Sequence, residues 1–221
     1  NQSGIREKEA RAANHEMNVT YENSLLFGIK SSVETIFISV GLGIVILCTA
    51  IGNLFVIYAI ITDRVLRRVS NYLVLSLATT DLILACTVMP LGVLYAISGK
   101  WTFGAKICEV WTSADVLCCT ASLLHLVAIA VDRYWAVTNV EYIRQRSAVI
   151  IGKMITAVWA VAIFTSLAPI FVFSDPHFEI RAEIENVCVV SQNVCYQIIA
   201  TILSFYAPLV VILFLYWKIF K

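Results

Sequence analysis

Two acidic residues, Asp81 and Asp115, stand inside long apolar stretches that contain no lysine or arginine. An ionisable side chain in the core of a bilayer costs at least about 2.5 kcal/mol on insertion scales, so each is a candidate functional residue. Without a cation from the protein, a carboxylate at such a depth has two options. It is protonated and hydrogen-bonded between helices, or it binds a cation from outside the chain. The residues alone leave both alternatives open.

Depth in the membrane separates the two carboxylates. Asp115 precedes Arg133 by eighteen residues, which is about 27 Å at a helical rise of about 1.5 Å per residue. If Arg133 marks the cytoplasmic face, Asp115 lies in the outer third of the membrane, where a small cation can reach it from outside. Asp81 lies deeper, where Asn53 and Ser122 supply further oxygen atoms. A small monovalent cation is the expected guest at Asp81, with water alone as the alternative.

A polar stripe continues below Asp115 on the same face of the third apolar stretch. Cys119 follows Asp115 by one helical turn and Ser122 by two, and Val116 and Thr120 flank them. Residues three and four apart are neighbours on the surface of a helix. We therefore expect these side chains to form one wall of a pocket around Asp115.

The fifth apolar stretch carries hydroxyl groups that suit the opposite wall. Thr201 and Ser204 are three residues apart and share a face of the helix. Pro208 cannot donate to the carbonyl of residue 204, so we expect the helix to be distorted at this level. Such a wall suits a ligand with a hydroxyl or an indole N–H at the end opposite its ammonium group. The alternative is that both hydroxyls bond carbonyls of their own helix.

Of the seven cysteines, Cys108 and Cys188 lie near the polar ends of apolar stretches, and they are the candidates for a disulfide. Cys108 lies two turns above Asp115 on about the same face of the helix. A bridge to Cys188 would hold the loop 174–193 as a lid over the pocket, and two free thiols are the alternative.

Asp132, Arg133 and Tyr134 place opposite charges side by side at the end of the third stretch. Taken alone, this arrangement predicts a surface ion pair, which contributes little to stability. His125, inside the same stretch, is expected to be a satisfied packing residue. The chain has no Ser–His–Asp arrangement, no phosphate-binding glycine loop and no cysteine or histidine spacing typical of zinc, so we expect no enzyme.

The elements that must position these residues are membrane helices. Apolar residues make up 60% of the chain and charged residues 14%, whereas a soluble domain carries about a quarter charged residues. A net charge of +1 creates no strong field that would favour nucleic acid or another highly charged partner. About twenty apolar residues cross a bilayer. Five stretches are long enough: 35–61, 69–97, 110–131, 154–173 and 194–217.

These stretches predict an all-α transmembrane helix bundle over residues 35–221, preceded by a polar tail over residues 1–34. The loops 62–68 and 139–152 carry five arginines between them, so we expect these loops to face the cytoplasm and the N-terminus to face outward. The tail is then extracellular. Its two N-glycosylation sequons, at Asn1 and Asn18, fall on the same oxidising side as the candidate disulfide.

Short motifs follow one another along the chain: Gly52-Asn53, Leu77-Ala78-Thr79-Thr80-Asp81, Trp101, Cys108, Asp132-Arg133-Tyr134, Trp159, Pro208 and Tyr216. In this order and at these spacings they resemble the rhodopsin-like G-protein-coupled receptors, over residues 35–221. Within that family, residues 115–139 look like the biogenic-amine receptors. They are most similar to type-1-like serotonin receptors, particularly invertebrate ones.

The resemblance implies a receptor in the plasma membrane, surrounded by lipid, that binds a small cationic amine, with serotonin as the expected ligand. It implies that Asp115 binds the ammonium group and that Thr201 and Ser204 face the aromatic end of the ligand. It also implies that Val190, two residues after Cys188, lines the lid.

The resemblance further implies a sodium ion at Asp81 and Ser122 and no other cofactor. A heterotrimeric G protein of the inhibitory class, which lowers cyclic AMP, would be engaged through Arg133 and the inner loops. Asp132, Tyr134 and Tyr216 match the family's activation switch.

Three departures from the family pattern bear on function. No proline follows Thr138, so the detail of the second inner loop differs. Ala200 stands where many amine receptors have a serine, which weakens recognition of a catechol. Five membrane helices are predicted where the family has seven, and the missing two would carry the aromatic floor of the pocket and the partner of Arg133.

The alternatives are therefore an octopamine, tyramine or dopamine receptor, or a truncated product that associates with intact receptors without signalling. The chain begins with Asn and stops at Lys221 directly after an apolar stretch, so we expect both ends to be cut from a longer protein. A transporter or channel built on Asp81 and Asp115 is a further alternative, although the five stretches show no inverted repeat.

Overall fold

The computed structural model describes residues 35–172 and 175–220, and it contains no strand within these ranges. Five helices are long and apolar enough to cross a membrane: Thr35–Thr62, Asn71–Ser98, Gly104–Thr138, Ala148–Phe171 and Val194–Ile219. The predicted all-α transmembrane bundle is therefore confirmed. The predicted tail, with Asn1 and Asn18, lies outside the described residues.

The chain divides into two compact units, and the boundary falls between Ile44 and Val45, inside the first helix. Residues 35–44 of the first unit are helical. All contacts described below lie within the second unit. Its elements after the first helix are α2 (Asn71–Ile83), η1 (Leu84–Val88), α3 (Met89–Ser98), α4 (Gly104–Thr138), α5 (Val140–Gln145), α6 (Ala148–Phe171), α7 (Phe178–Glu183), α8 (Val194–Thr201), η2 (Ile202–Tyr206) and α9 (Ala207–Phe220).

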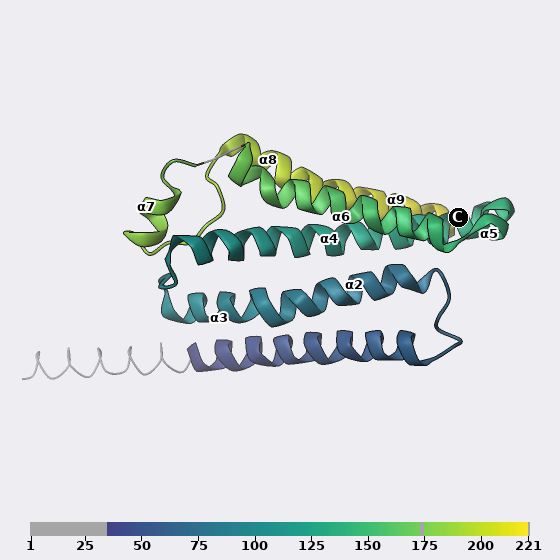
Figure 1. Ribbon diagram of the computed structural model, residues 1–221, viewed down its shortest axis with the longest axis horizontal. Helices are drawn as coiled ribbons and strands as arrows, with labels where there is room; N and C mark the ends of the chain where they lie inside the picture. Colours follow the sequence, from purple (N-terminus) through teal and green to yellow (C-terminus); the bar gives the residue numbers. More distant parts are fainter. Residues whose placement is uncertain (1–34, 173–174, 221) are drawn as a thin grey trace, which may run out of the picture. The chain divides into compact units, whose positions relative to one another are not determined.

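The central element of this unit is α4, which contacts α2 on one side and α6 and α9 on the other (Figure 1). One end of α4 carries Cys108 and the other carries Arg133, and we name the two ends of the bundle after these residues. The α4 helix is longer than the apolar stretch that predicted it, because its polar ends continue the helix beyond the apolar region.

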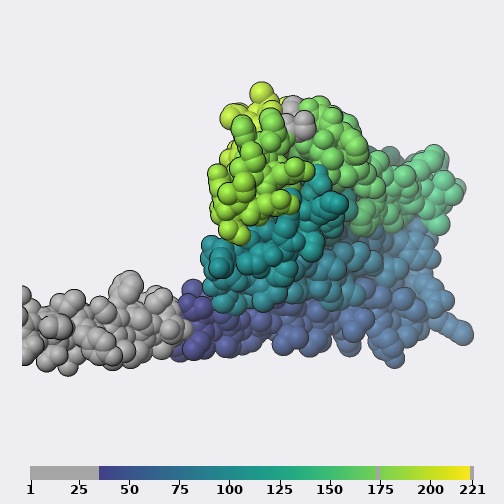
Figure 2. Space-filling model, turned by 60° about the vertical axis from the view of Figure 1, so that its left-hand side comes forward, coloured from purple at the N-terminus to yellow at the C-terminus, as the bar shows by residue number. Residues whose placement is uncertain are grey.

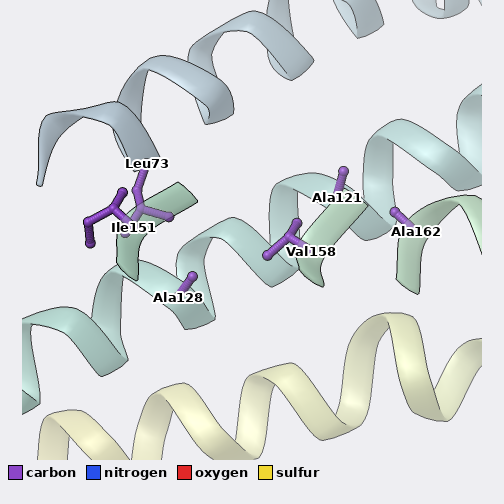
Figure 3. Close-up of a cluster of buried hydrophobic side chains, with 6 residues drawn as sticks. All are labelled: Leu73, Ala121, Ala128, Ile151, Val158 and Ala162. Atoms are coloured by element: carbon purple, nitrogen blue, oxygen red, sulfur yellow. The ribbon is translucent and has the colours of Figure 1, made fainter. Parts of the chain in front are cut away.

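Small side chains line the seam between α4 and α6 (Figure 3). Ala121 and Ala128 of α4 are buried in one cluster with Ile151 and Val158 of α6, and Leu73 of α2 lies beside Ile151. Lipid tails are as apolar as leucine, so helices in a membrane associate through close packing, which small residues permit. The seam therefore fixes the position of α4 against its neighbours by van der Waals contact.

Two of the spans contain a π-helical turn that ends just before a proline. The turn η1 ends at Val88, two residues before Pro90, and η2 ends at Tyr206, two residues before Pro208. Proline lacks a backbone N–H and crowds the preceding turn, and the wider π turn accommodates both effects. The distortion predicted near Pro208 is confirmed, whereas the one near Pro90 was not predicted.

A buried polar network joins α2, α4 and α6 beside the seam. His125 is fully buried; its Nδ1 lies 2.7 Å from the carbonyl oxygen of Ala121, and its Nε2 lies 2.8 Å from Oγ of Ser76. Trp159 Nε1–H donates to the same Ser76 oxygen at 3.2 Å. A carbonyl only accepts, so a neutral His125 carries its proton on Nδ1 and accepts the Ser76 hydroxyl proton at Nε2. His125 is thus the satisfied packing residue that the sequence predicted.

We predict that Ser76→Ala destabilises the bundle, because it leaves both His125 Nε2 and Trp159 Nε1–H without a partner. The expected cost is about 1–3 kcal/mol, measured as a lower melting temperature of the purified protein in detergent. The matched control is Thr79→Ala on the same helix, which removes an exposed hydroxyl bonded to the Leu75 carbonyl of its own helix. Equal melting of the two variants would contradict the network.

Candidate functional site

Asp115 lies half-buried on α4, four residues before Cys119. The Cys119 thiol donates a hydrogen bond to Asp115 Oδ1 at 3.5 Å. No lysine, arginine or histidine pairs with Asp115 within the described part of the chain. The carboxylate therefore retains most of its hydrogen-bonding capacity for a group from outside the chain.

The predicted facing wall meets α4 through a pair of hydroxyl groups. Thr120 Oγ1 and Ser204 Oγ lie 2.9 Å apart, which joins α4 to η2. Thr120 is almost fully buried, and Val116 is half-buried on the same helix. The Thr201 hydroxyl instead donates to the Gln197 carbonyl of its own helix at 2.7 Å. Of the two hydroxyls predicted on this wall, the structure brings that of Ser204 to the polar stripe. The hydroxyl of Thr201 bonds a carbonyl of its own helix, which was the alternative that the sequence left open.

Asp81 and Ser122 come together deeper in the bundle. Ser122 donates to Asp81 Oδ1 at 2.5 Å, which links α2 to α4. The Asn53 side chain donates to the Thr49 carbonyl of its own helix at 2.9 Å, and the described residues show no hydrogen bond between Asn53 and Asp81. Among the described residues there is no group of three or more His, Cys, Asp or Glu side chains that could hold a metal ion. A carboxylate and a hydroxyl suit a weakly held monovalent cation rather than a transition metal.

The predicted disulfide is present between Cys108 and Cys188, with their Cα atoms 5.7 Å apart. It attaches the connection between α6 and α8 to the beginning of α4, and Figure 2 shows the yellow-green residues of this connection against the teal end of α4. Two further bonds hold the same segment. Trp101 N–H donates to the Asn186 carbonyl at 2.7 Å, and Cys188 N–H donates to the Tyr95 hydroxyl at 3.3 Å.

Aromatic rings support this attachment. Trp101 stacks on Trp111 with ring centroids 5.0 Å apart, and Tyr95 contacts both rings edge-on. Trp111 Nε1–H donates to the carbonyl of Val88, the last residue of η1, at 2.9 Å. Trp111 thereby ties the span of α2 and α3 to α4 one turn above Asp115.

Val190, the predicted lid residue, lines a cavity of about 300 Å³ between α4, α6 and the loop. Asp115 is not among the residues that line this cavity. The structure therefore places Val190 beside the Cys108 end of α4 and does not bring it to the carboxylate.

At the Arg133 end, Asp132 is buried and does not form the surface ion pair with Arg133 that the sequence predicted. Asp132 forms an ion pair with Arg146 and accepts a hydrogen bond from the Tyr142 hydroxyl at 2.9 Å. The short helix α5, which was not predicted, carries Tyr142 into this position. Asn139 caps its N-terminus, and the Asn139 side chain accepts from two backbone N–H groups of the first turn.

Arg133 itself is exposed and has no ion-pair partner in the ranges that the structure describes. Tyr134 is half-buried on α4, and Tyr216 is exposed on α9. Sequence reasoning missed Tyr142 and Arg146, and the one local signal for them was Asn139, a residue type that caps helix N-termini.

Burial, the hydrogen bond to Asp132 and the charge of Asp132 raise the pKa of Tyr142 to about 12. The phenol therefore stays protonated and remains a donor at neutral pH. Because its pKa is raised above the ordinary value of 10.0, its stabilising effect is complete below that value and is lost as the pH rises towards about 12.

We predict that Arg146→Gln is far more destabilising than Arg144→Gln. The first change leaves a buried carboxylate without its cation, at a cost of about 2–3 kcal/mol. Arg144 is largely exposed and lies 4.0 Å from Glu141, so its loss should cost less than about 1 kcal/mol. The measurement is the melting temperature of both variants, and equal melting temperatures would refute a stabilising role of the buried ion pair.

Comparison with known proteins matches residues 52–221 to the family described as 7 transmembrane receptor (rhodopsin family). This match covers more than half of the chain, so the chain belongs to the rhodopsin family of seven-transmembrane receptors. Members of this family are receptors and not enzymes.

Several similar proteins are serotonin (5-hydroxytryptamine) receptors by name. The 5-hydroxytryptamine receptor 2A of Drosophila melanogaster is 58% identical over 183 residues, which are 83% of this chain and 22% of that protein. The 5-hydroxytryptamine receptor of Bombyx mori is 53% identical over 183 residues, 83% of this chain and 41% of that protein. The human 5-hydroxytryptamine receptor 1E is 42% identical over 204 residues, 92% of this chain and 55% of that protein. The chain thus spans between about a fifth and just over half of the length of these relatives.

Proposed function

We propose that the full-length protein is a plasma-membrane receptor for a small amine, with serotonin as its ligand, and that it couples ligand binding to the activation of a G protein. The observation that carries the proposal is Asp115, a carboxylate inside a membrane helix that has no cation from the described residues. A protonated amine supplies the missing charge. Relatives that carry the name of serotonin receptors support this choice of ligand.

The arrangement of hydroxyls favours an indole over a catechol at the other end of the ligand. Each hydroxyl has one donor and two acceptor lone pairs, and the Thr120–Ser204 contact uses one donor and one lone pair. Acceptor capacity therefore remains for an indole N–H. Ala200 supplies no hydroxyl one turn earlier, which removes a group that a catechol would need.

We predict that Asp115→Asn in the full-length receptor raises the Kd for serotonin at least about thirtyfold. Removing one partner of a desolvated charge pair costs about 2 kcal/mol or more. The measurement is saturation binding of radiolabelled serotonin to membranes. Glu109→Gln is the matched control, because it removes a carboxylate from the same helix six residues away. An unchanged affinity in Asp115→Asn would reject the proposal.

The distribution of arginines supports a cytoplasmic Arg133 end and an extracellular N-terminus. An extracellular tail would carry its glycosylation at Asn1 and Asn18. On this orientation, exposed Arg133 and the helix α5 face the G protein, which we assign to the inhibitory class. Tyr134 and Tyr216 would take part in the activation switch. Cyclic AMP in cells that express the full-length receptor tests this assignment: serotonin should lower it, and a rise would contradict the inhibitory class.

The same proposal includes a sodium ion at Asp81, supported by the carboxylate and hydroxyl that meet there. Asp81 and Ser122 would hold the ion, with Asn53 joining after a change of rotamer. A bound cation couples energetically to the ligand through α4, which carries both Ser122 and Asp115.

We predict that the affinity for serotonin depends on sodium in the wild type and not in Asp81→Asn. Binding is measured in sodium chloride and in an equal concentration of N-methyl-D-glucamine chloride, with potassium chloride as the control for ionic strength. A wild-type receptor whose affinity is the same in all three salts would show that no sodium ion is coupled to the ligand.

A further inference from the structure

One carboxylate, Asp175, joins three parts of the connection between α6 and α8. Its Oδ1 accepts the backbone N–H of His177 at 3.0 Å, and its Oδ2 accepts the backbone N–H of Gln192 at 3.2 Å. The guanidinium of Arg181 on α7 lies 2.8 Å from the same Oδ2. The Asp175 and Arg181 side chains are only 10% and 16% exposed, so the contacts are partly shielded from water.

The bond between Asp175 and Gln192 closes a ring of the chain across a sequence separation of 17 residues. This ring contains α7 and Cys188, which the disulfide fixes to α4. Residues 189–191 are therefore held on both sides, covalently at Cys188 and through the Asp175 carboxylate at Gln192.

The segment held in this way forms part of a cavity wall. The cavity of about 300 Å³ at the Cys108 end is lined by Val190 and Ser191 from the held segment and by Asp175 itself. Glu109 and Thr112 of α4 and Pro169 of α6 line the opposite sides. If the ring opens, Val190 and Ser191 lose their fixed position, and the wall of the cavity at the Cys108 end of α4 moves.

We propose that Asp175 is a positioning residue for ligand access, which holds residues 189–191 in place and so limits how fast an amine reaches and leaves the receptor. The proposal rests on the amine-receptor function proposed above and deepens it. Asp175 does not touch the ligand. It acts through the segment that ends at Gln192.

The tie is present over the whole physiological pH range. Burial raises the pKa of Asp175, but the hydrogen bonds from Arg181, His177 and Gln192 outweigh this effect and hold the pKa below its usual value of 3.8. A carboxyl group with a depressed pKa contributes its stabilisation above the ordinary value and loses it only as the pH falls through the lowered one.

Asp175→Asn is the variant that isolates the tie. Asparagine keeps the volume and the one oxygen that accepts from His177, but it presents an NH₂ group where Oδ2 accepts from Gln192 and forms the ion pair with Arg181. Arg181→Gln removes the ion pair and leaves the Gln192 bond. The matched control is Glu183→Gln, which removes an exposed charge from the same helix α7.

The test measures association and dissociation rates of radiolabelled serotonin on the full-length receptor. We expect both rates to rise about tenfold in Asp175→Asn, less in Arg181→Gln and not in Glu183→Gln, while the Kd changes less than about threefold. A tie that only stabilised the fold would lower the number of binding sites and leave both rates unchanged. Unchanged rates, or an equal rise in Glu183→Gln, would overturn the proposal.

Amide hydrogen exchange of the ligand-free receptor gives a second readout. The N–H of Gln192 should exchange faster in Asp175→Asn than in the wild type, and equal exchange would show that the tie does not hold this segment. The two proposals fail differently. A wild-type receptor that binds no serotonin rejects the proposed function, whereas normal serotonin binding with unaltered rates in Asp175→Asn rejects only the role of Asp175.

Discussion

Polar groups inside a membrane must find partners within the protein, and this constraint organises the whole bundle around α4. Ser122 of α4 bonds Asp81 of α2, and Thr120 bonds Ser204 of η2. Each contact takes a polar side chain of α4 and satisfies it on a neighbouring helix. Asp115 differs, because its hydrogen bond within the described residues comes from Cys119 of its own helix. The satisfied groups fix the helices, and Asp115, which has no partner on another helix among the described residues, is the group to which the proposed function assigns the ligand.

The two ends of α4 are fixed by different kinds of contact. At the Cys108 end a disulfide and stacked indole rings attach the loop, and these contacts depend little on charge. At the Arg133 end a buried carboxylate is shared between a phenol and a guanidinium, which is an arrangement with a large cost for losing either partner. Arg133, which lies next to this pair, keeps its charge exposed.

Hydropathy predicted the five helices because each apolar run is long, and the isolated carboxylates stood out because charge is rare inside such runs. The Cys108–Cys188 pairing followed from location alone. The helices α5 and α7 escaped prediction, since each is a six-residue helix in a polar loop whose stability depends on tertiary contacts rather than on periodicity. The partner of Asp132 was missed for a related reason. Arg146 lies 14 residues away, and only the turn through α5 brings it close.

The π turns change how positions along two of the spans correspond to directions in space. A π turn contains about one residue more than an α-helical turn, so the helix beyond it is rotated by about 100° from where uninterrupted α-helical counting would put it. Tyr95 lies beyond η1 and meets the Cys188 backbone. Thr201 is the last residue of α8, directly before η2 and on the opposite side of that turn from Pro208. A one-residue deletion in either turn would shorten the span very little and would instead swing Tyr95 or Thr201 onto a different face. Length variation at these two places therefore acts on the direction in which side chains point.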